Sequence, residues 1–157
     1  MPVTMHPNQI APWSGDWAWG LPLILFTVLI HVFGLGLIKR RVDHLMGYIW
    51  KYQALSIAGV TLSITLLHGF EVFLWAIVFR FLKAVPDFQT AMLYSMNALT
   101  AFGHTDVSLE RQWQFMGALE SLNGWILFGL STAYLFALIQ RIWSGSTSAL
   151  QVQASYR

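Results

Sequence analysis

The chain has 157 residues, of which 56% are hydrophobic and only 10% are charged. Average soluble domains carry about 25% charged residues, so this composition excludes an ordinary soluble protein and is typical of a membrane protein. The net charge of +2 gives no support to nucleic-acid binding, and the absence of cysteine excludes disulfides and thiolate metal sites.

The N-terminal third predicts an outer interfacial segment, one membrane span and a cytoplasmic loop. Residues 1–20 contain no Lys or Arg, so they lack the charged region of a cleavable signal peptide, and their tryptophans favour the lipid headgroup layer. Residues 21–38 contain no charged side chain and form the first span. The loop 39–53 carries four basic residues, which predicts that it is cytoplasmic and that the N-terminus lies outside.

The rest of the chain predicts two further spans. The second runs outward from about residue 54 to 79, and Arg80 and Lys83 mark its outer end. The third runs inward from about residue 113 to 139, and Arg141 closes it on the cytoplasmic side. Residues 142–157 are expected to be a mobile cytoplasmic tail. The predicted fold is therefore an all-α membrane protein with three transmembrane helices and no separate soluble domain.

The segment 87–106 lies between the second and third spans and is too short to cross a bilayer and return. Asp87 is a helix-capping residue, and good helix formers follow it as far as about Leu99. Residues 100–106 are polar, contain a glycine and show no regular period. A short helix followed by irregular backbone predicts a re-entrant loop, which survives at membrane depth only where it is buried in protein or lines a water-filled path.

Residues 100–106 read Thr-Ala-Phe-Gly-His-Thr-Asp, which resembles a divergent copy of the potassium-channel filter signature Thr-Thr-Val-Gly-Tyr-Gly-Asp. The flanking segments 68–76, 86–95 and 117–133 resemble small bacterial ion-channel proteins of the two-transmembrane potassium-channel class. The resemblance covers roughly residues 55–141, and an additional N-terminal span is usual in that family.

The resemblance implies a pore module over residues 54–141, with an outer helix, a pore helix with its loop, and an inner helix. It implies a homotetramer in the bacterial inner membrane that passes potassium or another monovalent cation, with the N-terminus outside and the C-terminus cytoplasmic. In that family, backbone carbonyls of four loops replace the hydration shell of the ion. The filter-like residues implied by the resemblance are Thr100, Ala101, Phe102, Gly103, His104, Thr105 and Asp106.

Four of these positions depart from the family signature, which leaves ion selectivity open. Thr105 stands where the family has its second glycine, and a positive φ there would cost on the order of 1–3 kcal/mol per subunit. Ala101 lacks the hydroxyl of the innermost ion site, and Phe102 is bulkier than valine. His104 replaces the bracing tyrosine and could make the outer mouth sensitive to pH. A wider or partly collapsed filter and an intact one are equally compatible with this sequence, and the first would give weaker discrimination, altered gating or no conduction.

Two intramembrane acids and two glycines have alternative interpretations. Glu71 and His68 are three residues apart and can pair on one helical face, either within a polar network behind the filter that includes Glu120 or as a local packing contact. Gly124 and Gly129 are either a gating hinge or sites of close helix packing.

Two rival functions remain. The filter departures also fit a non-conducting, channel-derived structural subunit of a larger membrane complex. His31 and His68 could in principle be axial haem ligands, but the chain lacks spaced histidine pairs on a four-helix core, so no cofactor and no metal site are expected. No nucleophile–base pair or phosphate-binding glycine loop supports an enzyme.

Overall fold

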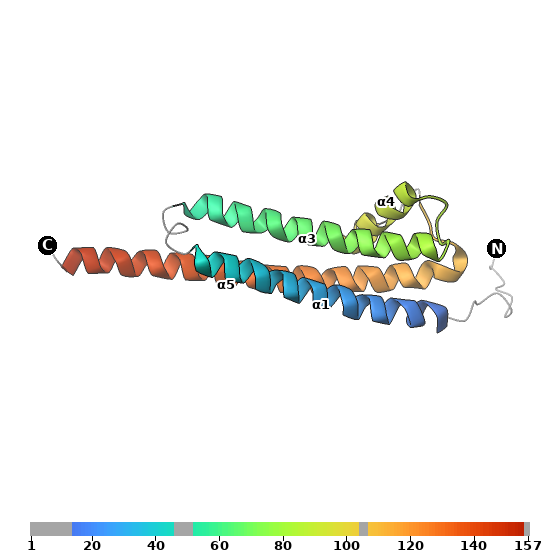
Figure 1. The fold of residues 1–157 in the computed structure, drawn as a ribbon, viewed down its shortest axis with the longest axis horizontal. Coiled ribbons are helices and arrows are strands. Elements are labelled where there is room, and N and C mark those ends of the chain that lie inside the picture. Colours follow the sequence, from blue (N-terminus) through green and yellow to red (C-terminus); the bar gives the residue numbers. More distant parts are fainter. Residues whose placement is uncertain (1–13, 46–51, 104–106, 156–157) are drawn as a thin grey trace, which may run out of the picture. The chain divides into compact units, whose positions relative to one another are not determined.

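The computed structural model describes residues 14–45, 52–103 and 107–155, with side chains up to residue 144, and over these ranges the chain forms helices and no strand. The elements are α1 (Ser14–His44), α3 (Gln53–Phe81), α4 (Phe88–Leu99), a short 3-10 helix (Arg111–Trp113) and α5 (Gln114–Ser155) (Figure 1). Three helical stretches are long and apolar enough to cross a membrane: Ser14–His44, Gln53–Phe81 and Arg111–Ser144. The expectation of an all-α protein with three helices of membrane-spanning length is confirmed.

The long helices extend beyond the predicted spans because hydropathy marks the edge of the apolar region and not the end of a helix. α1 starts at Ser14 and carries Asp16 in its first turn and Arg41 and His44 in its last, where these charges suit the helix dipole. α5 continues to Ser155 through the segment that was expected to be a mobile tail. That segment contains no proline, so nothing in its sequence forces the helix to stop.

The helix α4 begins and ends close to its predicted limits, and its N-terminal end carries a local start signal. Asp87 is its N-cap, and its carboxylate accepts hydrogen bonds from Thr90 N at 2.8 Å and from Thr90 Oγ1 at 2.7 Å. One stripe of α4 is buried, with the helical spacing i, i+3, i+4, i+7 and i+8: Ala91, Tyr94, Ser95, Ala98 and Leu99.

The cap of α4 predicts a specific pH dependence. The hydrogen bonds from Thr90 hold the pKa of Asp87 below its ordinary value, so this contribution to stability is present above the unfolded pKa and is lost as the pH falls through the folded pKa. We expect Asp87→Asn, which retains a capping oxygen, to remove this dependence. The difference in Tm between the wild type and the variant should be largest at pH 6 and shrink toward pH 2.5. A difference that does not change with pH would contradict the assignment.

The structure divides into two compact units, which are described separately. The first unit contains the chain up to Thr27 together with Val72–Gly124. Its apolar core contains residues of α3, α4 and the start of α5, Leu23 of α1, and three residues of the segments between helices (Ala84, Val85 and Leu109). Its largest members are Trp75, Phe79, Tyr94 and Met116. Two buried polar contacts tie α1 to α5 here. Asp16 accepts a hydrogen bond from Met116 N at 2.9 Å, and Asn123 donates to Thr27 Oγ1 at 2.8 Å.

The contact between Asp16 and Met116 acts as a helix cap supplied by a remote residue. Met116 is the third residue of α5, so its N–H has no acceptor within its own helix. Asp16 is only 2% exposed and supplies that acceptor from α1.

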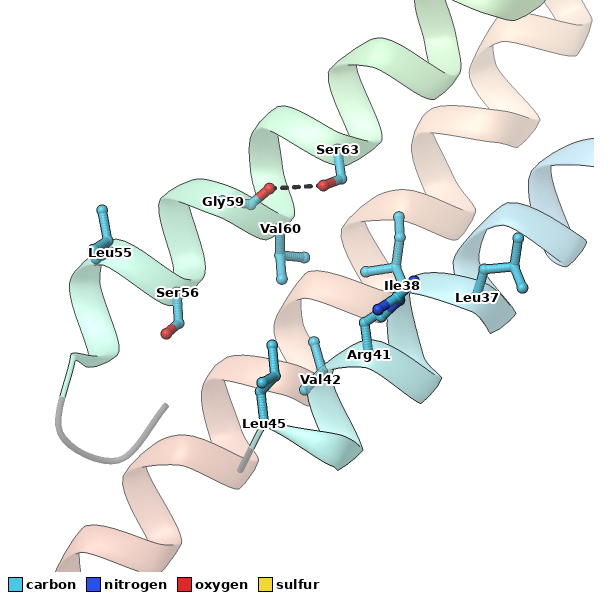
Figure 2. Close-up of a pocket in the computed structure, with 10 residues that line it drawn as sticks. All are labelled: Leu37, Ile38, Arg41, Val42, Leu45, Leu55, Ser56, Gly59, Val60 and Ser63. Carbon is cyan, nitrogen blue, oxygen red and sulfur yellow. Dashed lines mark hydrogen bonds between the residues drawn. The ribbon is translucent and has the colours of Figure 1, made fainter. Parts of the chain in front are cut away.

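The second unit contains Val28–Glu71 and Trp125–Arg157. Its apolar cluster is formed by Val42, Val60, Ile64, Leu138 and Ile142. A cavity of about 390 Å³ lies between the C-terminal part of α1 and the N-terminal part of α3, and Figure 2 shows apolar side chains of both helices around it. Arg41 is the charged residue of its lining. Asp43 pairs with Lys39 at 2.9 Å and also contacts the Arg141 guanidinium.

Candidate functional site

Four of the seven filter-like residues lie in the described part of the chain. Thr100 is the C-cap of α4, and its hydroxyl donates to the Met96 carbonyl at 2.8 Å. Phe102 is 84% exposed, and Gly103 has a φ of 95°, a value that glycine adopts readily. His104, Thr105 and Asp106 lie outside the described residues, so the expected strain at Thr105, the pH effect of His104 and a contact between Glu120 and Asp106 stay predictions.

A left-handed residue terminates α4 immediately before Phe102. Ala101 has a φ of 53°, its N–H donates to the Ala98 carbonyl at 3.0 Å, and the Phe102 N–H donates to the Asn97 carbonyl at 3.0 Å. These two bonds form a Schellman motif, in which glycine is the usual left-handed residue. The left-handed backbone of Ala101 is not predictable from its residue type, because the hydrogen bonds at the helix end impose this conformation.

Ser95 and Glu120 connect the buried face of α4 to its neighbours in the first unit. The Ser95 hydroxyl lies 3.0 Å from the Val72 carbonyl of α3 and also contacts the Glu120 carboxyl group of α5. Both side chains are fully buried, and Glu120 Oε2 has no hydrogen-bond partner among the described residues. Of the three members of the predicted polar network, it is therefore Glu120 that contacts the short helix.

His68 and Glu71 belong to a cluster in the second unit. His68 Nδ1 lies 3.0 Å from Glu71 Oε2, so the pairing expected from their spacing is present. Glu71 Oε1 lies 2.7 Å from His31 Nδ1. The Nε2 atoms of His31 and His68 lie 3.0 and 3.1 Å from the Ser131 hydroxyl oxygen. The four side chains close a ring of hydrogen-bond contacts across α1, α3 and α5, called here the polar ring.

The polar ring is enclosed by protein. His31 and Glu71 are fully buried, Ser131 is 5% exposed and His68 is 9% exposed, with its imidazole packed against Phe128 at a centroid distance of 4.4 Å. Sequence reasoning missed the role of His31, although it is the single ionisable residue within 21–38 and such residues normally have an intramembrane partner. Ser131 carries no comparable signal, since serine is common where helices pack closely.

The geometry of the polar ring does not fit the haem considered above. The His31 and His68 rings have a centroid separation of 5.0 Å, and each ring contacts both Glu71 and Ser131 through its nitrogens. A porphyrin between the two imidazoles would displace both of those side chains. The same donors can instead surround a single ion, because one ligand atom each of His31, His68 and Glu71 lies within 4.8 Å of the others.

Gly124 and Gly129 have different surroundings in α5, which is helical through both. A Cβ on Gly124 would lie 2.0 Å from the Leu99 carbonyl oxygen at the end of α4, whereas a Cβ on Gly129 would meet nothing within 4 Å. For Gly124 this contact supports the close-packing interpretation. Gly117 is a similar site, since its Cβ would lie 2.0 Å from Tyr94 Oη of α4.

Comparisons of the chain with protein-family models, with curated proteins and with solved structures found no match.

Proposed function

We propose that this chain is one subunit of a tetrameric cation channel of the potassium-channel type, in which α4 and the segment after it form the pore loop. The observation that carries the proposal is α4 itself. Its 12 residues span only about 18 Å, well short of the roughly 30 Å apolar core of a bilayer. It lies in the chain between two helices of membrane-spanning length and packs one face against α3 and α5.

Close contacts with α3 and α5 fix the position of α4 within the first unit. Tyr94 covers Gly117, Ser95 bonds the α3 backbone, and Leu99 lies directly against Gly124. The carboxyl end of a helix carries a partial negative charge that favours a nearby cation. In the proposed re-entrant arrangement, this end of α4 is directed into the membrane, and the residues from Thr100 onward follow it along the ion path.

The other face of α4 supports assembly. Leu93 is 54% exposed and Met96 is 45% exposed, although both are apolar, and Phe102, three residues after the end of α4, is 84% exposed. Neighbouring copies cover this face in the proposed tetramer. Four chains are needed because one loop supplies one quarter of a filter ring.

The distribution of basic residues supports the proposed orientation in a bacterial inner membrane. Arg40 and Arg41 lie near the C-terminal end of α1, and Arg141 lies near the C-terminal end of the membrane-spanning stretch Arg111–Ser144. By the positive-inside rule these ends are cytoplasmic, so the N-terminus is outside and the C-terminus inside.

The test is potassium and sodium flux into liposomes that contain the purified protein, with mass determination of the same sample. We expect a tetramer with cation flux. Gly103→Trp should abolish the flux without changing the mass, because a bulky side chain replaces a left-handed glycine in the loop. Gly36→Trp is the matched control, since Gly36 lies on an exposed part of α1 with nothing within 4 Å of a Cβ, and it should conduct normally.

Two outcomes would overturn the proposal. Flux that is unchanged in Gly103→Trp would show that ions do not pass this loop. A wild-type protein that carries no flux and co-purifies at fixed stoichiometry with a larger membrane complex would favour the non-conducting structural subunit.

A further inference from the structure

The polar ring has donor chemistry that the proposed pore does not use. We propose that it is a binding site for one divalent transition-metal ion, with Zn²⁺ as the representative ion. The ligands are His31 Nδ1, His68 Nδ1 and the Glu71 carboxylate, and Ser131 holds the two imidazoles from the opposite side. This site is independent of whether the chain conducts ions.

The first support is geometric. His31 Nδ1 and His68 Nδ1 lie 2.7 and 3.0 Å from different oxygens of the same carboxylate. Ligands held about 2.0–2.1 Å from zinc in a tetrahedron lie about 3.4 Å from one another. The two nitrogen–oxygen distances therefore need to lengthen by about 0.7 and 0.4 Å to admit the ion. They come from two helices, α1 and α3, so helix packing already brings the ligands together.

The second support is the number of hydrogens in the ring. Its four contacts need one hydrogen each, but two neutral imidazoles and one hydroxyl supply three and a carboxylate supplies none. If both Nδ1 atoms donate to Glu71, both Nε2 atoms are acceptors, and the single hydroxyl hydrogen of Ser131 serves only one of them. In the other contact with Ser131, the lone pair of Nε2 faces a lone pair of Oγ with no hydrogen between them. With two neutral imidazoles, one of the four contacts therefore has no hydrogen between its two atoms.

A metal ion on the Glu71 side removes this deficit. The ion accepts a lone pair from each Nδ1 atom and from the Glu71 carboxylate, so no hydrogen is needed between these atoms. Each neutral imidazole then carries its single ring hydrogen on Nε2. Both Nε2–H groups then donate to Ser131 Oγ, which has two lone pairs and sits 3.0 and 3.1 Å away. Outer hydrogen bonds of this kind set the tautomer and orientation of metal-bound histidines.

The third support is the chemical type of the donors. Two imidazole nitrogens and one carboxylate form the His₂Glu set found at zinc sites that keep one position open. Imidazole also suits iron, nickel and copper, whereas magnesium and calcium prefer oxygen ligands. Full burial of Glu71 adds a reason for a cationic partner, because an isolated carboxylate in an apolar environment is costly.

The test measures metal binding to the full chain in detergent after treatment with a chelator. Zn²⁺ is titrated calorimetrically, and bound metal is counted by elemental analysis after dialysis. Co²⁺ serves as a second probe, because four-coordinate cobalt absorbs strongly in the visible range. We expect one Zn²⁺ per chain, a four-coordinate cobalt spectrum, and loss of both in His31→Gln, His68→Gln and Glu71→Gln.

Matched variants keep the result interpretable. Glu120→Gln makes the same change at another fully buried carboxyl group, and His44→Gln removes an exposed histidine; both should bind Zn²⁺ like the wild type. Ser131→Ala leaves all three ligands in place and should weaken binding about 10- to 100-fold, which keeps the proposal testable if a ligand variant does not fold.

Three results would overturn the proposal: no Zn²⁺ retained by the wild type, binding that persists in the ligand variants, or binding lost with His44→Gln. If no metal binds and ¹⁵N NMR shows one imidazolium in the ring, an additional proton supplies the fourth hydrogen, and the site is a charged hydrogen-bond cluster and not a metal site.

Discussion

Gly124→Ala is expected to destabilise the first unit by about 1–3 kcal/mol, the usual range for an overpacked site. The added Cβ would lie 2.0 Å from the Leu99 carbonyl oxygen and 2.8 Å from its carbon. These are backbone atoms at the end of α4, so no side-chain rotation relieves the contact, and α4 or α5 has to move. Thermal unfolding in detergent, followed by circular dichroism, measures the loss, and hydrogen exchange shows whether α4 loses protection.

Gly129→Ala is the matched control for this prediction. It makes the same substitution five residues later in α5, where nothing lies within 4 Å of the new Cβ. Alanine is the better helix former by about 1 kcal/mol, so this variant should be as stable as the wild type or more stable. Equal stability of Gly124→Ala and Gly129→Ala would contradict the inference that α4 packs closely on α5 at Gly124. The proposed channel adds a second readout, since a displaced pore helix should also lose its flux.

Glu71→Leu should strongly destabilise the second unit, with an expected loss of about 3–5 kcal/mol in metal-free protein. Glu71 is fully buried and is the common partner of His31 Nδ1 and His68 Nδ1. Replacing Glu71 leaves both histidine Nδ1 atoms buried without a hydrogen-bond partner. An unpaired buried polar group costs more free energy of unfolding than the intact contact contributes. The free energy of unfolding, measured with chelator present, checks the prediction.

Glu120→Leu is the comparison for Glu71→Leu. Glu120 is equally buried, but its contact is to the single hydroxyl of Ser95, and its Oε2 has no partner among the described residues. Its loss should cost about 1–3 kcal/mol, because one hydrogen-bond partner and not two is removed. Equal effects of the two substitutions would contradict the central role of Glu71 in the polar ring.

The helices of this protein are readable from the sequence because their signals are local. Long apolar stretches bounded by basic residues predict the membrane-spanning helices. Pro86 and Asp87 predict where α4 begins, and the structure places its N-cap at Asp87. The spacing of His68 and Glu71 predicts their contact, since residues three apart in a helix are neighbours. The length of α5 is not readable in this way, because a polar segment without proline or a capping signal does not end a helix.

The contacts between helices were decided only by the tertiary structure. His31 reaches Glu71 across 40 positions of the chain, and Ser131 reaches His31 across 100. Asp16 caps α5 at Met116, also 100 positions away, and Gly124 accommodates Leu99. These contacts depend on how each helix is rotated about its own axis. A helix that is apolar around most of its circumference does not encode that rotation in its hydrophobic pattern. The sequence by itself therefore determined which segments are helical, and packing decided which polar side chains meet.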